Sequence, residues 1–279
     1  MTPTGFRLAC LAVTIGLPLA AQEPPRVLRI FREEIKPGRN AAHEKVEMGY
    51  VRAFSKAKYG NYLGMDSLSG TNEAWFFEPY DSYASLEKAI QLTEKSPTLK
   101  AELAVLDPQD GDVRTGGRVL IATRNQGLSY PGAGQPGSMG KNRYVQVQII
   151  RIRPGHNLEF QTARGMLNEA WKKMKVEQGR PVYNVSSGMP GGTFLVLGAT
   201  SSLSTLDPAP SAMTVPQAMG EADFAKYQKL LAESEINAEN FLFALNPRMS
   251  NPPKQFLEAD KEFWAPKPKA AAAKAGTSQ

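Results

Sequence analysis

The segment Ile35-Lys36-Pro37-Gly38-Arg39-Asn40 returns 117 residues later as Ile152-Arg153-Pro154-Gly155-His156-Asn157. Each copy follows a β-rich run and precedes apolar residues that recur at helical spacing. A repeat of this length is the size of a small domain, so the sequence predicts one α+β unit written twice.

Both copies show the same order of expected elements. The first copy has predicted strands at 26–35, 59–68, 73–78 and 118–123, and the second at 144–152, 181–187, 193–198 and 240–245. In each copy one helix follows the first strand and another follows the hairpin. This β-α-β-β-α-β order is the ferredoxin-like arrangement, whose sheet carries both helices on one face. Two such units can pack their open faces together, sheet to sheet.

The strand-Pro-Gly-helix opening and the phrase NEAWFFEPYDSY (residues 72–83) resemble the dimeric α/β-barrel superfamily. Within it the resemblance is to NIPSNAP-like domains and to the antibiotic-biosynthesis-monooxygenase type, over about residues 26–246. It implies an α+β fold of two tandem ferredoxin-like repeats that form an intramolecular dimeric α/β barrel. Members of this superfamily include cofactor-free oxygenases, haem proteins, isomerases and proteins without known activity, so the resemblance selects a fold and not a reaction.

The start of the chain has the pattern of a signal peptide. Arg7 precedes a mostly apolar stretch that ends in Ala20-Ala21, which predicts cleavage there and a periplasmic or extracellular location. Cys10 is the only cysteine and lies in this segment, so the mature chain is expected to have no thiol. The predicted division is 1–21 signal peptide, 22–124 first repeat, 125–142 Gly/Pro-rich linker, 143–250 second repeat and 251–279 extension with a basic low-complexity tail.

The charge of the chain does not indicate a nucleic-acid partner. The net charge is +6, and much of the excess lies in the C-terminal tail and not in a patterned face. No segment of the mature chain is long and apolar enough to predict an integral membrane helix. A homo-oligomer is compatible with the sequence.

The strands of the two copies suggest where a ligand would bind, because side chains on a strand alternate between its faces. Leu28 and Ile30 are apolar, as are their counterparts in the second copy, so this parity is expected under the helices. The alternate residues of the same two strands, which point to the other face, are then expected to line the space between the sheets together with two aromatic residues. The predicted ligand-binding residues are Arg29, Phe31, Glu33, Tyr62, Trp75, Gln146 and Gln148.

Glu33 is also the weak candidate for a catalytic residue. A carboxylate in a pocket could act as a general base if burial raised its pKa, whereas Arg29 on the same face would hold it ionised. The two histidines, His43 and His156, show no H-x-x-H spacing, and His43 takes the place of Phe160 in the second copy. We therefore expect no metal site and no cofactor, with His43 as a half-buried helix residue.

Three functions remain open at this point. The first is binding of a small, largely apolar molecule between the two sheets. The second is a cofactor-free monooxygenase-like enzyme, and the third is a structural or interaction protein whose barrel is filled by side chains. A dry, filled barrel would favour the third.

Overall fold

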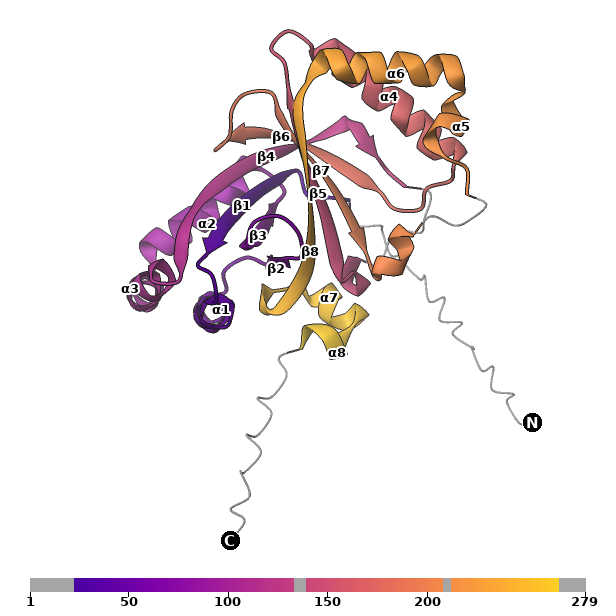
Figure 1. Ribbon diagram of the computed structural model, residues 1–279. Helices are drawn as coiled ribbons and strands as arrows, with labels where there is room; N and C mark the ends of the chain where they lie inside the picture. Colours follow the sequence, from indigo (N-terminus) through magenta and orange to yellow (C-terminus); the bar gives the residue numbers. More distant parts are fainter. Residues whose placement is uncertain (1–22, 133–138, 208–211, 266–279) are drawn as a thin grey trace, which may run out of the picture.

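A computed structural model describes residues 23–132, 139–207 and 212–265 (Figure 1). The first half of the chain has the predicted order of elements with one additional helix, α3. Its elements are β1 (Val27–Ile35), α1 (Asn40–Lys56), β2 (Tyr62–Ser67), β3 (Glu73–Tyr80), α2 (Tyr83–Lys95), α3 (Pro97–Gly111) and β4 (Arg114–Tyr130). Helix α3 is capped by Ser96, whose side chain accepts a hydrogen bond from the amide of Leu99, and Pro97 occupies its first turn.

The second half of the chain repeats this order. Its elements are β5 (Tyr144–Ile152), α4 (Asn157–Lys173), β6 (Arg180–Ser187), β7 (Thr193–Thr200), α5 (Val215–Met219), α6 (Glu221–Ser234) and β8 (Glu235–Asn251), followed by α7 (Lys254–Ala259) and α8 (Lys261–Trp264). Both bounds of β5 and both bounds of α4 lie 117 residues after those of β1 and α1. Lys58 and Lys175, also 117 apart, both have a positive φ of 54° after these helices.

The eight strands close into one antiparallel barrel in the order β1-β3-β2-β8-β5-β7-β6-β4. Each half contributes four neighbouring strands in the ferredoxin-like order, β4-β1-β3-β2 and β8-β5-β7-β6. The two half-sheets are joined at their edges, where β2 pairs with β8 and β4 pairs with β6. Closure leaves no unpaired sheet edge, and it confirms the predicted fold class.

Helices cover the outside of the barrel. In Figure 1, α1, α2 and α3 lie beside the first half and α4, α5 and α6 beside the second. Beneath α1, an apolar cluster that includes Phe31, Tyr62 and Phe76 joins the helix to the sheet. A second cluster, which includes Ile150 and Phe160, does the same beneath α4.

Side chains from both halves fill the interior of the barrel. Leu28 and Ile30 from β1 belong to the same buried cluster as Val145 and Val147 from β5, with Trp75 fully buried among them. An eight-stranded barrel is just wide enough for its interior to be filled in this way. The structure therefore has the filled barrel that would favour the third hypothesis, a structural or interaction protein.

The predicted assignment of strand faces is wrong. The apolar parity of β1 and β5 points into the barrel, and the polar parity points outward under the helices. Because the barrel interior is enclosed by the sheet, it holds mainly apolar side chains, more so than the helix-covered face. The helix-covered face offers polar partners from the helices, and it tolerates charged residues.

The C-terminal helices close one end of the barrel. Trp264 is 2% exposed and joins the interior cluster together with Phe256. The indole Nε1 of Trp264 donates a hydrogen bond of 2.6 Å to the carbonyl oxygen of Gly140. The low-complexity tail was predicted to begin at Trp264, but this residue is the inner end of a plug formed by α7 and α8.

Other boundary predictions have mixed outcomes. The linker predicted at 125–142 begins too early, because β4 continues to Tyr130 and pairs there with Arg180. The predicted signal peptide and most of the basic tail lie outside the described residues, so export and the cleavage site stay predictions. Among the described helices, none combines the length and the apolar character that a membrane crossing requires.

Candidate functional site

Four buried residues that carry metal-ligating groups converge on the outer face of the first half. They are Glu33, His43, Glu47 and Asp110, here called the His43 cluster, and they are 8%, 1%, 4% and 3% exposed. Each offers one ligand atom, and these four atoms all lie within 4.8 Å of one another. Charged side chains are rarely buried to this extent unless they are paired or bind a metal.

Three elements supply the cluster. His43 and Glu47 lie one turn apart on α1, so both face the sheet. Glu33 has the outward parity of β1, directly beneath this helix. Asp110 comes from the end of α3, the helix that the sequence did not predict.

The distances within the cluster are those of groups that could share one ion. His43 Nε2 lies 2.9 Å from Glu33 Oε2, 3.8 Å from Glu47 Oε1 and 4.0 Å from Asp110 Oδ1. Neighbouring ligands of a tetrahedral zinc ion are about 3.4 Å apart, since each bond is about 2.1 Å long. Metal binding would therefore need His43 and Glu33, which share a hydrogen bond here, to separate slightly and the other ligand atoms to move closer.

Arg114 orients two of the three carboxylates. Its Nη1 lies 2.9 Å from Glu33 Oε1 and its Nη2 lies 2.6 Å from Asp110 Oδ2. The second oxygen of each carboxylate is the one that approaches His43. Among the described residues, Asp110 Oδ1 has no hydrogen-bond partner although it is buried. An outer partner that fixes one oxygen and presents the other is typical of metal sites.

The cluster carries more negative charge than its surroundings neutralise. Burial, together with the charges of Glu33 and Asp110, raises the pKa of Glu47 well above its usual value. Burial and the charge of Glu33 raise the pKa of Asp110 to about 6, against the opposite effect of Arg114 and His43. A bound divalent cation would remove this conflict.

The second half shows that the fold does not require these residues. The counterparts of Glu33, His43 and Glu47, each 117 residues later, are Ile150, Phe160 and Arg164. Ile150 and Phe160 are buried in an ordinary apolar cluster beneath α4. Because the same position in the second half packs well with apolar side chains, the fold by itself does not require a polar cluster here.

In the metal-free protein, Asp110 is expected to change the stability with pH in the direction opposite to that of most acidic residues. Its pKa is 3.8 in the unfolded chain and about 6 in the folded protein, so the folded state binds the proton more tightly. The contribution of Asp110 to the free energy of unfolding, up to about 3 kcal/mol, is fully present below about pH 4 and is lost as the pH rises through 6. Glu33, Glu47, His43 and Arg114 all face this group.

The measurement is urea unfolding at pH 4.5 and 6.5 in the presence of a chelator, for the natural protein and Asp110→Asn. The difference in unfolding free energy between the two proteins should change by about 2 kcal/mol between the two pH values, in favour of the variant at pH 6.5, because this range covers only part of the titration. Other titrating groups cancel in the difference. A difference that is constant across the two pH values would contradict the assignment.

The structure separates the residues that the sequence analysis grouped together. Arg29 pairs with Glu78 at 2.5 Å and also contacts Tyr59, and it does not pair with Glu33. The arginine that pairs with Glu33 is Arg114. Of the predicted ligand-binding set, only Trp75 faces the barrel interior, where its Nε1 donates to Glu73 Oε2 at 2.5 Å. The residues that face outward instead are Arg29, Phe31, Glu33, Tyr62, Gln146 and Gln148.

Sequence reasoning missed three residues of the cluster. His43 was expected to be half-buried, and no metal site was expected, whereas the structure surrounds this side chain with carboxylates. The available signal was the i, i+4 pair His43 and Glu47 on a helix whose counterpart carries Phe160. Asp110 gave no signal, because the helix that carries it was not predicted.

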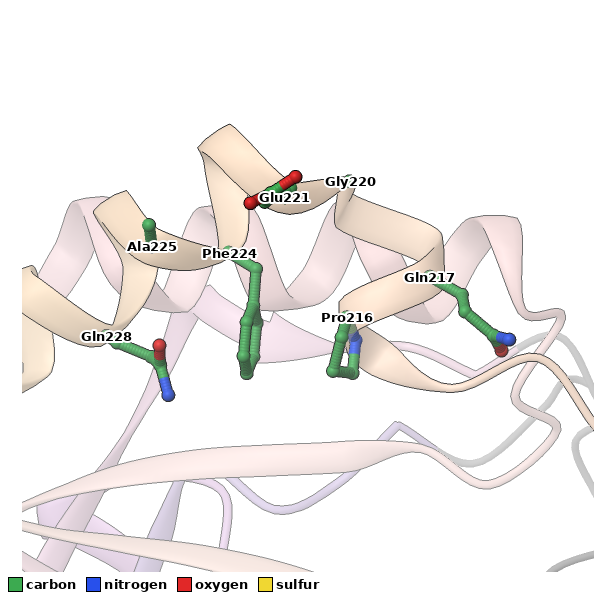
Figure 2. A pocket seen from close by; sticks show the side chains of 7 residues that line it. All are labelled: Pro216, Gln217, Gly220, Glu221, Phe224, Ala225 and Gln228. Atoms are coloured by element: carbon green, nitrogen blue, oxygen red, sulfur yellow. The ribbon is translucent and has the colours of Figure 1, made fainter.

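The structure has two surface hollows. One, of about 400 Å³, is lined by residues 111 and 114–119. It includes Arg114, whose side chain is 31% exposed and pairs with Glu33 and Asp110, so this hollow lies beside the His43 cluster. The other, of about 470 Å³, lies under α5 and α6, where Pro216 and Phe224 project from the two helices (Figure 2).

Comparisons with known proteins support the fold. A search of protein-family models and of curated protein sequences gives no match. A solved structure described as an anthrone oxidase-like protein matches with a TM-score of 0.51 at 14% identity, over 80% of this chain and 92% of that chain. A provisionally assigned monooxygenase from Fusobacterium nucleatum matches with a TM-score of 0.50 at 10% identity, over 80% and 94%.

A chlorite dismutase variant from Candidatus Nitrospira defluvii matches over 87% of this chain and 97% of that chain, at 12% identity and a TM-score of 0.46. At these identities the matches bear on the fold alone. The two oxygenase-like structures agree with the barrel of paired ferredoxin-like units, and they leave the chemistry of this chain to its own residues.

Proposed function

We propose that the protein binds a divalent transition-metal ion at the His43 cluster, and that this site is its functional centre. The observation that carries the proposal is the convergence of one imidazole and three carboxylates, all buried, within 4.8 Å. One nitrogen and three oxygen ligands suit Zn²⁺, Mn²⁺ or Fe²⁺ better than the soft ions that thiolates select. Arg114 would be the outer residue that holds Glu33 and Asp110 in place.

The ligand set limits what the bound ion would do. With four protein ligands, a tetrahedral ion would be enclosed and would stabilise the packing of α1 and α3 against β1. An octahedral ion would keep two positions for water or a substrate. The hollow beside Arg114 is the side from which such a molecule would approach.

The two hypotheses that place a ligand between the sheets require the displacement of side chains. The described side chains fill the barrel, and the plug of α7 and α8 closes one end. An apolar molecule, or the substrate of a monooxygenase-like reaction, would have to displace side chains of this interior cluster. The His43 cluster needs only small movements of its own side chains, so metal binding is the function that the geometry supports best.

The proposal predicts that metal ions stabilise the protein. After removal of metal by a chelator, Zn²⁺ or Mn²⁺ at 100 times its dissociation constant should add about 2.7 kcal/mol to the free energy of unfolding. For a chain of this size that corresponds to a rise in Tm of about 5–10 °C. The measurement is thermal unfolding with and without each ion.

Two variants control this experiment. His43→Phe introduces the residue that the second half has at this position, and it should remove the metal-dependent rise in Tm. His156→Gln removes the other histidine, which is half-exposed and lies outside the cluster, and it should keep the rise. Equal rises in the natural protein and in His43→Phe would show that the ion binds elsewhere.

A further inference from the structure

The second half buries an arginine at the place where the first half buries a carboxylate. Arg164 on α4 lies 117 residues after Glu47 and is 4% exposed. Among the described residues, its Nε and Nη2 atoms have no hydrogen-bond partner. A buried guanidinium without partners is costly, so a group that satisfies it is expected.

The two unpaired atoms are the ones that bind oxyanions. The N–H groups of Nε and Nη2 point in the same direction from one edge of the guanidinium. This edge makes the two parallel hydrogen bonds of a bidentate contact with a carboxylate or a phosphate. The ring of Trp171, 5.2 Å from the Cζ atom, contacts the guanidinium as a cation–π partner and leaves its edge free.

A second arginine, Arg180, is half-buried at the start of β6 and acts electrostatically on Arg164. Its guanidinium rests on the backbone of Gly198, where the Cβ of any other residue would collide with Nη1. Burial and the charge of Arg180 lower the pKa of Arg164, and burial lowers the pKa of Arg180 itself. The two cations therefore repel each other across a region that an anion would stabilise.

Nearby side chains do not satisfy the unpaired edge of Arg164. Tyr227 and Glu235 favour the charged form of Arg164, but in the described part of the chain no ion pair within 4.0 Å joins Glu235 to it. Asn168, one turn after Arg164 on α4, donates its amide to the carbonyl oxygen of Leu128 at 3.3 Å. Its Oδ1 atom is buried and has no hydrogen-bond partner among the described residues, so unpaired donors and an unpaired acceptor lie one turn apart on the same helix.

The hollow under α5 and α6 is lined by residues of these two helices and not by Arg164 itself. Phe224, which projects into the hollow in Figure 2, stacks on Tyr227 with ring centroids 6.2 Å apart. Tyr227 in turn contributes to the electrostatic environment of Arg164, and α6 packs on α4, the helix that carries Arg164.

We infer that the second half holds a site for a small oxyanion, a carboxylate or a phosphate, bound through the Nε/Nη2 edge of Arg164 with Arg180 as the second cation. This site is separate from the His43 cluster and does not depend on it. The two halves of the barrel would then use equivalent positions for ligands of opposite charge.

The experiment measures the Tm of the full mature chain in chelator at constant ionic strength, with chloride replaced stepwise by inorganic phosphate or by acetate. The natural protein should gain at least about 3 °C at the highest concentration of one of the two anions, as expected for a ligand well above its dissociation constant. Phosphate alone, acetate alone, or both would support the site and would identify the oxyanion that it prefers.

Two variants separate a specific site from a general salt effect. Arg164→Gln removes the charge and should abolish the gain, and its own Tm in chloride should be no lower than that of the natural protein. Arg164→Lys keeps the charge without the planar edge and should lose most of the gain. Lys229→Gln, at an exposed lysine of α6, is the matched control and should keep it. A gain of equal size in Arg164→Gln, or no gain in the natural protein, would overturn the inference.

Discussion

The Glu47→Gln variant is expected to be more stable than the natural protein when no metal is bound. Among the described residues no cation forms a hydrogen bond with Glu47, and the basic side chain that lies nearest in an ion-pair geometry is His43, with Nε2 at 3.8 Å. Burial and two neighbouring carboxylates raise its pKa, so holding it in the folded state becomes more costly as the pH rises above about 4.5. Glutamine has nearly the same shape without the charge.

The expected gain in the free energy of unfolding is about 1–3 kcal/mol at pH 7.5, and it should shrink at pH 5. Urea unfolding in chelator at the two pH values measures it. The same variant should lose most of the stabilisation by Zn²⁺ or Mn²⁺, because one of four ligands is gone. Removal of Glu47 would then stabilise the protein and weaken metal binding. A residue with both effects has a functional and not a structural role.

Arg114→Gln is the matched control with the opposite sign. Arg114 is the cation that pairs with both Glu33 and Asp110, so its removal leaves three carboxylates around one histidine. This variant should be less stable than the natural protein without metal, and the loss should be larger at pH 7.5 than at pH 5. If both variants shift stability in the same direction, the charge balance described for the cluster is wrong.

The Trp264→Ala variant is expected to lose about 3–5 kcal/mol of unfolding free energy. The indole is enclosed at the end of the barrel, stacks edge-on against Phe263 at 4.8 Å and donates its N–H to Gly140. Alanine would leave a cavity in the interior cluster and an unsatisfied carbonyl oxygen. The loss would appear as a lower urea midpoint with an unchanged slope.

Phe263→Ala provides the comparison within the same helix. Phe263 belongs to the same helix α8 but is only partly buried, and Arg143 lies over its ring. Its removal should cost clearly less than that of Trp264. Equal and small losses from both variants would mean that α7 and α8 do not form a stable part of the barrel.

The fold could be predicted because its evidence is local and occurs twice. The Pro-Gly turn after β1 recurs after β5, and the apolar stripe of α1 recurs in α4 at the same offset. Those patterns determine element order, and element order together with closure determines the sheet. Helix α3 escaped prediction because its apolar residues are not confined to one face and because Pro108 lies inside it.

The site could be predicted only in part. Glu33 was selected because its parity on β1 is polar, but the parity was assigned to the wrong face of the sheet. Which face of the sheet is more shielded from water depends on barrel closure, and closure is a property of all eight strands together. The partners of Glu33 come from α1 and α3, far apart in sequence, and no spacing rule brings Asp110 next to His43.

The central claim is that the His43 cluster holds a metal ion, and anomalous diffraction tests it most directly. Crystals of the protein would be grown after chelation and reloading with Zn²⁺, with data collected on both sides of the zinc absorption edge. The account predicts an anomalous peak within about 2.1 Å of His43 Nε2 and of the carboxylate oxygens of Glu33, Glu47 and Asp110. Loaded crystals with no peak there, or with zinc only at surface residues such as His156, would contradict it.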